Sequence, residues 1–210
     1  MGSSQPKKLN ARNKKQLWLL AGGNGAGKST FYRTQLEPLG MAFINADILA
    51  QQLYPNEAEQ RSYDAAKIAE NLRLELLTEG RSFCFETVFS HPSKIDFIAK
   101  AKILGYEIVL VYIHLETAAL NQARVSQRVS EGGHHVPSDK VISRIPRVMK
   151  NIKQAFPLCD FSYILDNSRL DNPFQQIAVI KHNQIHFTHE PLPTWAKELL
   201  SHYLIMIEVS

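Results

Sequence analysis

The residues best suited to chemistry form one short glycine-rich run between an apolar segment and a segment free of glycine and proline. The run consists of Gly22, Gly23, Asn24, Gly25, Ala26, Gly27, Lys28, Ser29 and Thr30, and it fits the pattern G-x-x-x-x-G-K-[ST]. In this pattern backbone N–H groups converge on a phosphate, the lysine reaches the β- and γ-phosphates of a nucleotide, and the first hydroxyl binds Mg²⁺. We therefore predict that the run binds ATP, with Lys28 on the phosphates and Ser29 on Mg²⁺.

Two carboxylates follow apolar segments further along the chain. Asp47 comes after residues 41–44, and Glu86 directly follows residues 83–85. A carboxylate beside the γ-phosphate can accept the proton of an acceptor hydroxyl, so Asp47 is a candidate general base, although it could instead cap the next helix. Glu86, with Thr87 beside it, could bind the hydroxyls of a sugar, hold Mg²⁺ through water or cap a helix.

Basic residues in the second half of the chain are candidates for contact with the transferred phosphoryl group. Arg124 and Arg128 are four residues apart, so they share one helix face, which runs into the loop at residues 132–137. Arg144 and Arg147 on the next predicted helix could reach the same phosphates. We predict a mobile lid over this stretch, while a plain solvated helix edge is the alternative for the arginines.

The elements that must position these residues alternate between strands and helices. Such alternation predicts an α/β protein with a parallel five-stranded sheet, and in such sheets ligands bind at the carboxyl ends of the strands. The glycine run, Asp47 and Glu86 should therefore meet at one edge. The predicted strands are 17–21, 41–44, 83–85, 106–113 and 161–165; the predicted helices are 29–36, 57–79, 92–104, 117–131 and one from 138; a hairpin at 177–187 and a helix at 193–203 follow.

Composition and charge limit the classes of protein that fit. The net charge of +4 comes from residues 1–15, which carry five basic residues and no acid, and the remainder has 19 basic against 20 acidic residues. We expect a basic tail at 1–15, a core at 16–170 and an extension at 171–210 packed on the core. A nearly neutral body argues against a nucleic-acid partner, because a nucleic-acid-binding face needs a basic stripe.

We see no pattern of a membrane span or a signal peptide in the sequence. No apolar stretch approaches the ~20 residues of a membrane span, and the N-terminus lacks the apolar segment of a signal peptide. The chain has two cysteines, Cys84 and Cys159, in very different contexts. We expect free thiols and a cytoplasmic protein with no membrane partner.

Several ordered motifs together resemble the short, single-domain branch of the zeta toxin family. They are the glycine run with Phe31, then residues 44–47, 85–87, 124–125, 128–129, 132–137 and 166–168. The resemblance covers about residues 16–170 and implies a kinase that phosphorylates UDP-N-acetylglucosamine, with ATP and Mg²⁺ as cofactors and an antitoxin protein as a possible partner. It also implies Asp47 as the base, Glu86 as a contact for the amino sugar and Arg128 on the phosphates.

The chain departs from the family pattern at two places. His134 stands where longer members carry a second arginine, and Pro146 interrupts the pattern of the helix that holds Arg144. His134 and its neighbour His135 are weak evidence for a metal site, because no spaced ligand accompanies them. The alternatives to the sugar kinase are a small-molecule kinase with another acceptor, and an ATP-binding protein without transfer or toxin role.

Overall fold

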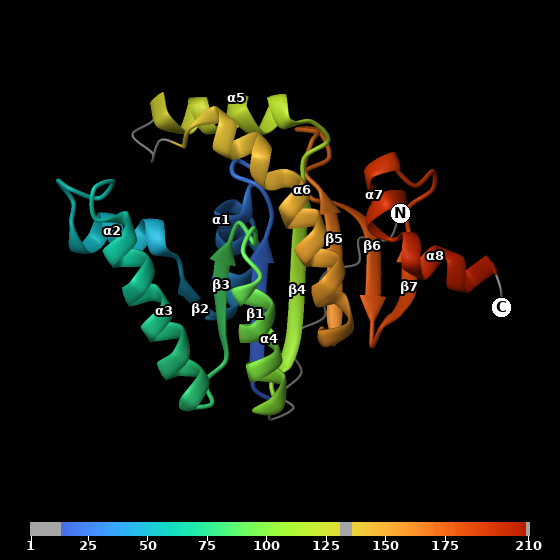
Figure 1. Ribbon diagram of the computed structural model, residues 1–210, viewed down its shortest axis with the longest axis horizontal. Helices are drawn as coiled ribbons and strands as arrows, with labels where there is room; N and C mark the ends of the chain where they lie inside the picture. Colours follow the sequence, from blue (N-terminus) through green and yellow to red (C-terminus); the bar gives the residue numbers. More distant parts are fainter. Residues whose placement is uncertain (1–13, 131–135, 209–210) are drawn as a thin grey trace.

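A seven-stranded mixed sheet forms the centre of the computed structural model, which describes residues 14–130 and 136–208 (Figure 1). The strand order is β2-β3-β1-β4-β5-β6-β7. The first five strands in this order pair in parallel, β6 pairs antiparallel with β5, and β7 pairs antiparallel with β6. The predicted α/β fold with five parallel strands is therefore confirmed. The strands are β1 Gln16–Ala21, β2 Ala42–Ile44, β3 Phe83–Thr87, β4 Glu107–His114, β5 Phe161–Asp166, β6 Gln175–Lys181 and β7 Gln184–Thr188.

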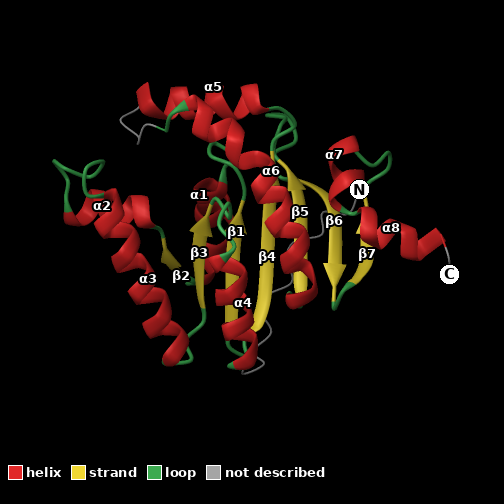
Figure 2. Cartoon of the chain, viewed as in Figure 1, coloured by secondary structure: helices red, strands yellow, loops and turns green. Residues whose placement is uncertain are grey.

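Helices cover both faces of the sheet and its carboxyl edge (Figure 2). α3, α4 and α6 contribute Leu77, Ile98 and Ile152 to the core on one face, and α1 with the turn that follows it packs on the other. The helices are α1 Lys28–Phe31, a π-helical turn Tyr32–Leu36, α2 Ala46–Leu53, α3 Ser62–Thr78, α4 Ser93–Ile103, α5 Ala118–Ser130, α6 Ser138–Ala155, α7 Thr194–Leu199 and α8 Ser201–Glu208, with 3-10 turns Glu37–Leu39 and Phe156–Leu158.

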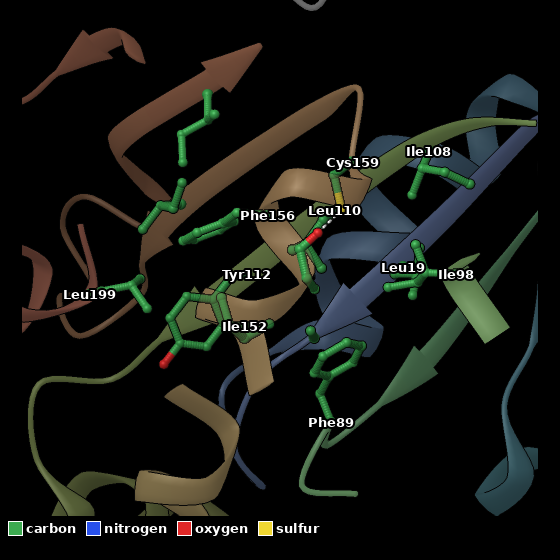
Figure 3. Close-up of a cluster of buried hydrophobic side chains, with 14 of the residues drawn as sticks. Leu19, Phe89, Ile98, Ile108, Leu110, Tyr112, Ile152, Phe156, Cys159 and Leu199 are labelled. Carbon is green, nitrogen blue, oxygen red and sulfur yellow. Dashed lines mark hydrogen bonds between the residues drawn. The ribbon is translucent and has the colours of Figure 1, made fainter. Parts of the chain in front are cut away.

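The larger core cluster lies between the sheet and the layer of α4 and α6 (Figure 3). Strand residues such as Leu19 and Leu110 are fully buried there, each worth ~1.5–3 kcal/mol relative to exposure. Cys159 also lies in this core, and its Sγ–H donates to the Ala155 carbonyl at 3.2 Å. Both Cys84 and Cys159 are buried free thiols, as expected. No helix within the described ranges has the length and apolar character needed to cross a bilayer.

The structure differs from the sequence-based element boundaries in four places. The helix expected at 57–79 begins only at Ser62, and the first helix changes to a π-helical turn after Phe31. The terminal helix is divided in two. α6 continues through Pro146.

The last forty residues extend the sheet beyond β5. Their hairpin pairs through β6 with β5, and Ile177, Ala196 and Tyr203 belong to the same core cluster as the parallel strands. The hairpin is thus a continuation of the sheet, because its apolar side chains bury more surface beside β5 than they could as a separate two-stranded unit. The division into tail, core and extension stays a prediction, and residues 1–13 of the basic tail lie outside the described residues.

Candidate nucleotide-binding and phosphotransfer site

The glycine run forms the loop between β1 and α1, and its glycines are required by close backbone approach. Gly27 has φ 96°, and a Cβ there would lie 2.5 Å from Asn167 Nδ2. A Cβ at Gly22 would lie 2.3 Å from the Ile113 carbonyl oxygen. Neither position has room for a side chain, and the left-handed conformation of Gly27 is costly for other residues. The loop and the first turn of α1 therefore form a tight cradle at the carboxyl edge of the sheet.

Three polar side chains from distant elements hold this loop. Asn121 Nδ2 on α5 donates to the Asn24 carbonyl at 2.6 Å, and Asn167 Nδ2 after β5 donates to the Ala26 carbonyl at 2.9 Å. Arg144 Nη1 on α6 donates to Asn24 Oδ1 at 3.3 Å. Both asparagines are buried, so these hydrogen bonds are shielded from water. The loop is consequently organised by the surrounding fold as well as by its own glycines.

Lys28 is a buried cation whose positive charge is only partly balanced by neighbouring carboxylates. Its side chain is 5% exposed, its Nζ donates to the Gly23 carbonyl at 2.9 Å, and it lies 3.6 Å from Glu86 Oε1. Burial lowers the pKa of Lys28, the charge of Arg128 lowers it further, and Glu86 and Asp47 act in the opposite direction. A phosphate at the loop would supply the negative charge that this site lacks.

Glu86 connects the glycine loop to β2. Its Oε2 accepts hydrogen bonds from Ser29 Oγ at 2.6 Å and from Asn45 Nδ2 at 2.9 Å. A hydroxyl oxygen and a carboxylate oxygen thus meet beside the phosphate loop, and both are metal ligands of the kind that Mg²⁺ prefers. The residues present fit a Mg²⁺ ion, with Ser29 as a direct ligand and Glu86 holding it directly or through water.

Asp47 lies in the first turn of α2 but does not cap this helix. Asn45 is the cap, because its Oδ1 accepts from the backbone N–H groups of Asp47 at 2.8 Å and Ile48 at 3.2 Å. The capping alternative for Asp47 is therefore wrong. Asp47 is solvent-exposed, and its charge acts on Lys28. This leaves its carboxylate available to a molecule that binds beside the loop.

α5 and the start of α6 lie over the carboxyl edge of the sheet, where the loop is (Figure 1). A Cβ on Gly25 would lie 3.2 Å from the Cβ of Arg124, and the charge of Arg128 acts on Lys28, so both arginines of α5 are next to the loop. Arg147 is exposed, and its Nε donates to the Ser143 carbonyl of its own helix at 3.3 Å. The hypothesis that Arg147 approaches the phosphates with Arg144 is therefore not supported.

Some of the remaining predicted site residues lie within the described residues and some lie outside them. Thr87 lies at the end of β3, and its Oγ1 accepts from the Phe89 N–H at 3.0 Å, which stabilises the turn after the strand. Thr30 is exposed on α1. His134 and His135, with the rest of residues 131–135, lie outside the described residues. The catalytic and substrate-binding roles of all these residues stay predictions.

Sequence reasoning missed Asn121 and the roles of Asn45 and Asn167. A single signal pointed to Asn121: it is a polar residue at helical spacing from Arg124 and Val125, on a helix face that is buried. Nothing in its local sequence indicates that its partner is the carbonyl of Asn24, 97 positions away.

Comparison with known proteins gives one family and several similar proteins. The AAA_33 family model, described as an AAA domain, matches residues 17–152. An uncharacterized protein of Haemophilus influenzae (strain ATCC 51907 / DSM 11121 / KW20 / Rd) is 30% identical over 135 residues, which are 61% of this chain and 96% of that protein.

Two solved structures share the fold at low sequence identity. A crystal structure of AvrRxo1-ORF1:-ORF2 with ATP matches with a TM-score of 0.68 and 18% identity over 90% of this chain. A structure from the PezAT chromosomal toxin-antitoxin system of Streptococcus pneumoniae matches with a TM-score of 0.63 and 18% identity over 94% of this chain and 87% of that chain. This chain spans only 63% of the matched AvrRxo1 chain.

Proposed function

We propose that this chain, which belongs to the AAA domain family, is an ATP-dependent kinase that phosphorylates a hydroxyl group of a sugar, with UDP-N-acetylglucosamine as the acceptor. The observation that carries the proposal is the set of contacts that joins Lys28, Ser29 and Glu86 at a tight glycine loop. Asp47 is an exposed residue whose charge acts on Lys28 of this set. The resemblance of the ordered motifs to the zeta toxin family supports the choice of acceptor.

In this proposal the loop and Lys28 bind the phosphates of ATP. Ser29 and Glu86 would hold Mg²⁺, which would neutralise charge on the phosphate oxygens. Lys28 and Arg128 stabilise the charge of the phosphoryl group during transfer, and Arg144, through Asn24, keeps the loop in place. Glu86 and Thr87 are the proposed contacts for the acceptor, although the short distance between Glu86 and Ser29 favours a role for Glu86 on the metal side.

Asp47 is proposed as the general base. The acceptor hydroxyl oxygen forms the new bond to the γ-phosphorus, the bond from that phosphorus to the bridging oxygen of ADP breaks, and the hydroxyl proton passes to the Asp47 carboxylate. The role requires a carboxylate that is not already engaged by its helix, and the cap at Asn45 leaves Asp47 in that state.

Two of the similar structures suggest a protein partner. PezAT is described as a toxin-antitoxin system, and AvrRxo1-ORF1 was solved together with AvrRxo1-ORF2. We accordingly propose an antitoxin protein as a partner of this chain, beside its small-molecule acceptor.

The experiment incubates the protein with labelled ATP, Mg²⁺ and a panel of nucleotide sugars and free sugars. Asp47→Asn should retain the fold and ATP affinity but reduce transfer by ~10²–10⁴-fold, because it keeps the shape and loses the basicity. Asp96→Asn, a change of the same kind at an exposed aspartate in the first turn of α4, is the matched control. Transfer to a different acceptor would support the small-molecule kinase instead, and ATP binding without any transfer would leave only an ATP-binding protein.

A further inference from the structure

Arg73 on α3 is a buried arginine that lies against an aromatic ring. Arg73 is 8% exposed, and its guanidinium carbon lies 5.1 Å from the centroid of the Phe85 ring on β3. Phe97 of α4 contacts the same ring edge-to-face, with the two centroids 5.5 Å apart. Arg73 is therefore held in place by an apolar surface built from β3 and α4.

The guanidinium of Arg73 has no polar partner among the described residues. No hydrogen bond or ion pair of its nitrogens with residues 14–130 or 136–208 is present. Its nitrogens are also not among the fully buried atoms without a partner, so the small exposed part of the residue includes the charged group. A buried guanidinium that reaches solvent without a counter-ion can bind an anion that enters from solvent.

A second cation, Lys94, lies close to Arg73. Burial lowers the pKa of Lys94, the charge of Arg73 lowers it further, and Glu70 opposes both effects. Burial also lowers the pKa of Arg73, again opposed by Glu70. Glu70 is exposed and forms no ion pair within the described part of the chain, so the two cations share the charge of one exposed carboxylate.

The topology puts this pair at the carboxyl edge of the sheet. Both α3 and α4 run antiparallel to β3, and Lys94 is in the first turn of α4, next to the end of the strand (Figure 1). Side chains on a helix lean toward its N-terminus, so Arg73 leans toward the same edge. Phe85, under the guanidinium, immediately precedes Glu86, which contacts Ser29 from the opposite face of the sheet.

We propose that Arg73 and Lys94 form an anion subsite that binds a phosphate group of the acceptor. The assignment to the acceptor rests on the proposed kinase function, because the phosphates of ATP already have the glycine loop on the other side of β3. The diphosphate of a nucleotide sugar carries about two negative charges, one on each phosphate, and its non-bridging oxygens accept hydrogen bonds, which matches a planar guanidinium and an ammonium better than a single carboxylate does.

The test uses inorganic phosphate as the probe and protein loaded with a nonhydrolysable ATP analogue and Mg²⁺, so that the glycine loop is occupied. Phosphate is titrated while the Arg73 Nε–H signal and the backbone amides of the first turn of α4 are followed by NMR. We expect saturable shifts in the wild type. Lys94→Met should raise the dissociation constant for phosphate by ~10-fold or more, because it removes a charge-assisted contact.

Two variants separate a binding role from a structural one. Lys100→Met removes an exposed lysine from the same helix and should leave phosphate binding unchanged. Arg73→Met keeps an apolar stem on Phe85 while it removes the charge, and the amides of α4 should then lose their phosphate-dependent shifts. If Arg73→Met does not fold, Lys94→Met still decides the question, because Lys94 is only half-buried.

Several results would overturn the proposal. Shifts that do not saturate, an unchanged dissociation constant in Lys94→Met, or tighter binding of malonate than of phosphate would each refute a phosphate subsite. The titration needs no turnover, so its failure is distinct from failure of the kinase assay. In that assay Lys94→Met should raise KM for UDP-N-acetylglucosamine ~10-fold with kcat unchanged.

Discussion

Lowering the pH should destabilise the protein through His114, a residue that lies behind the glycine loop. His114 ends β4 and is 7% exposed, and its Nδ1 lies 2.9 Å from the Tyr112 hydroxyl. Its ring stacks on Trp195 of α7 with centroids 4.0 Å apart. Its carbonyl accepts the N–H of Asn167, whose side chain holds the loop at Ala26. Protonation of His114 would therefore place an unpaired charge in a packed region next to the site.

Burial lowers the pKa of His114 from 6.5 to about 4, and the charge of Asp166 opposes this effect only in part. The unfolded chain binds a proton near pH 6.5, whereas the folded chain does so only near pH 4. Stability from neutral His114 is thus fully present above pH 6.5 and is lost as the pH falls toward 4. Each pKa unit corresponds to ~1.4 kcal/mol, so the loss across this window is ~3 kcal/mol.

The assay is urea unfolding of the wild type and His114→Phe at several pH values between 7.5 and 4. Phenylalanine keeps the stacking on Trp195 and cannot titrate, and the other titrating groups are the same in both proteins. The loss of the Tyr112 hydrogen bond lowers the stability of the variant by an amount that does not depend on pH in this range. The wild type should lose ~3 kcal/mol more than the variant between pH 7 and pH 4. Parallel stability curves for the two proteins would refute this reasoning.

Three further predictions concern the loop and the helices above it. Lys28→Ala should weaken ATP binding ~10-fold or more by calorimetry, because it removes a charge-assisted contact worth ~1.5–3 kcal/mol, and equal affinities would exclude this contact. Gly27→Ala should lower the free energy of unfolding, measured in urea, by ~1–3 kcal/mol, because the residue has φ 96° and the added Cβ would lie 2.5 Å from Asn167 Nδ2. Gly40→Ala is the control for backbone strain alone, since Gly40 has φ 72° and nothing lies within 4 Å of the added Cβ. Adding a nonhydrolysable ATP analogue and Mg²⁺ should slow hydrogen exchange of the amides around Arg124 and Arg144; protection confined to residues 22–30 would show that these helices do not respond to the nucleotide.

The sequence was most informative where chemistry depends on a short segment. The glycine run, its strand and its helix are adjacent in the chain, so their residue types alone predict a phosphate cradle. The alternation of apolar segments with helical ones likewise predicted the five parallel strands. The predicted boundaries differ from the structure where local propensity does not decide them, as in the start of α3 at Ser62 and the continuity of α6 through Pro146.

The tertiary structure decided which side chains meet. Asn121, Arg144 and Asn167 contact the loop from positions 97 to 141 residues away, and their partners depend on how α5, α6 and β5 pack. The same holds for the choice of Asn45 rather than Asp47 as a helix cap, for Glu86 beside Ser29, and for the place of Arg73 on the ring of Phe85. Periodicity predicts which face of an element is buried. The partner of a polar group on that face is decided by strand register and helix packing, because these bring together residues that are far apart in the chain.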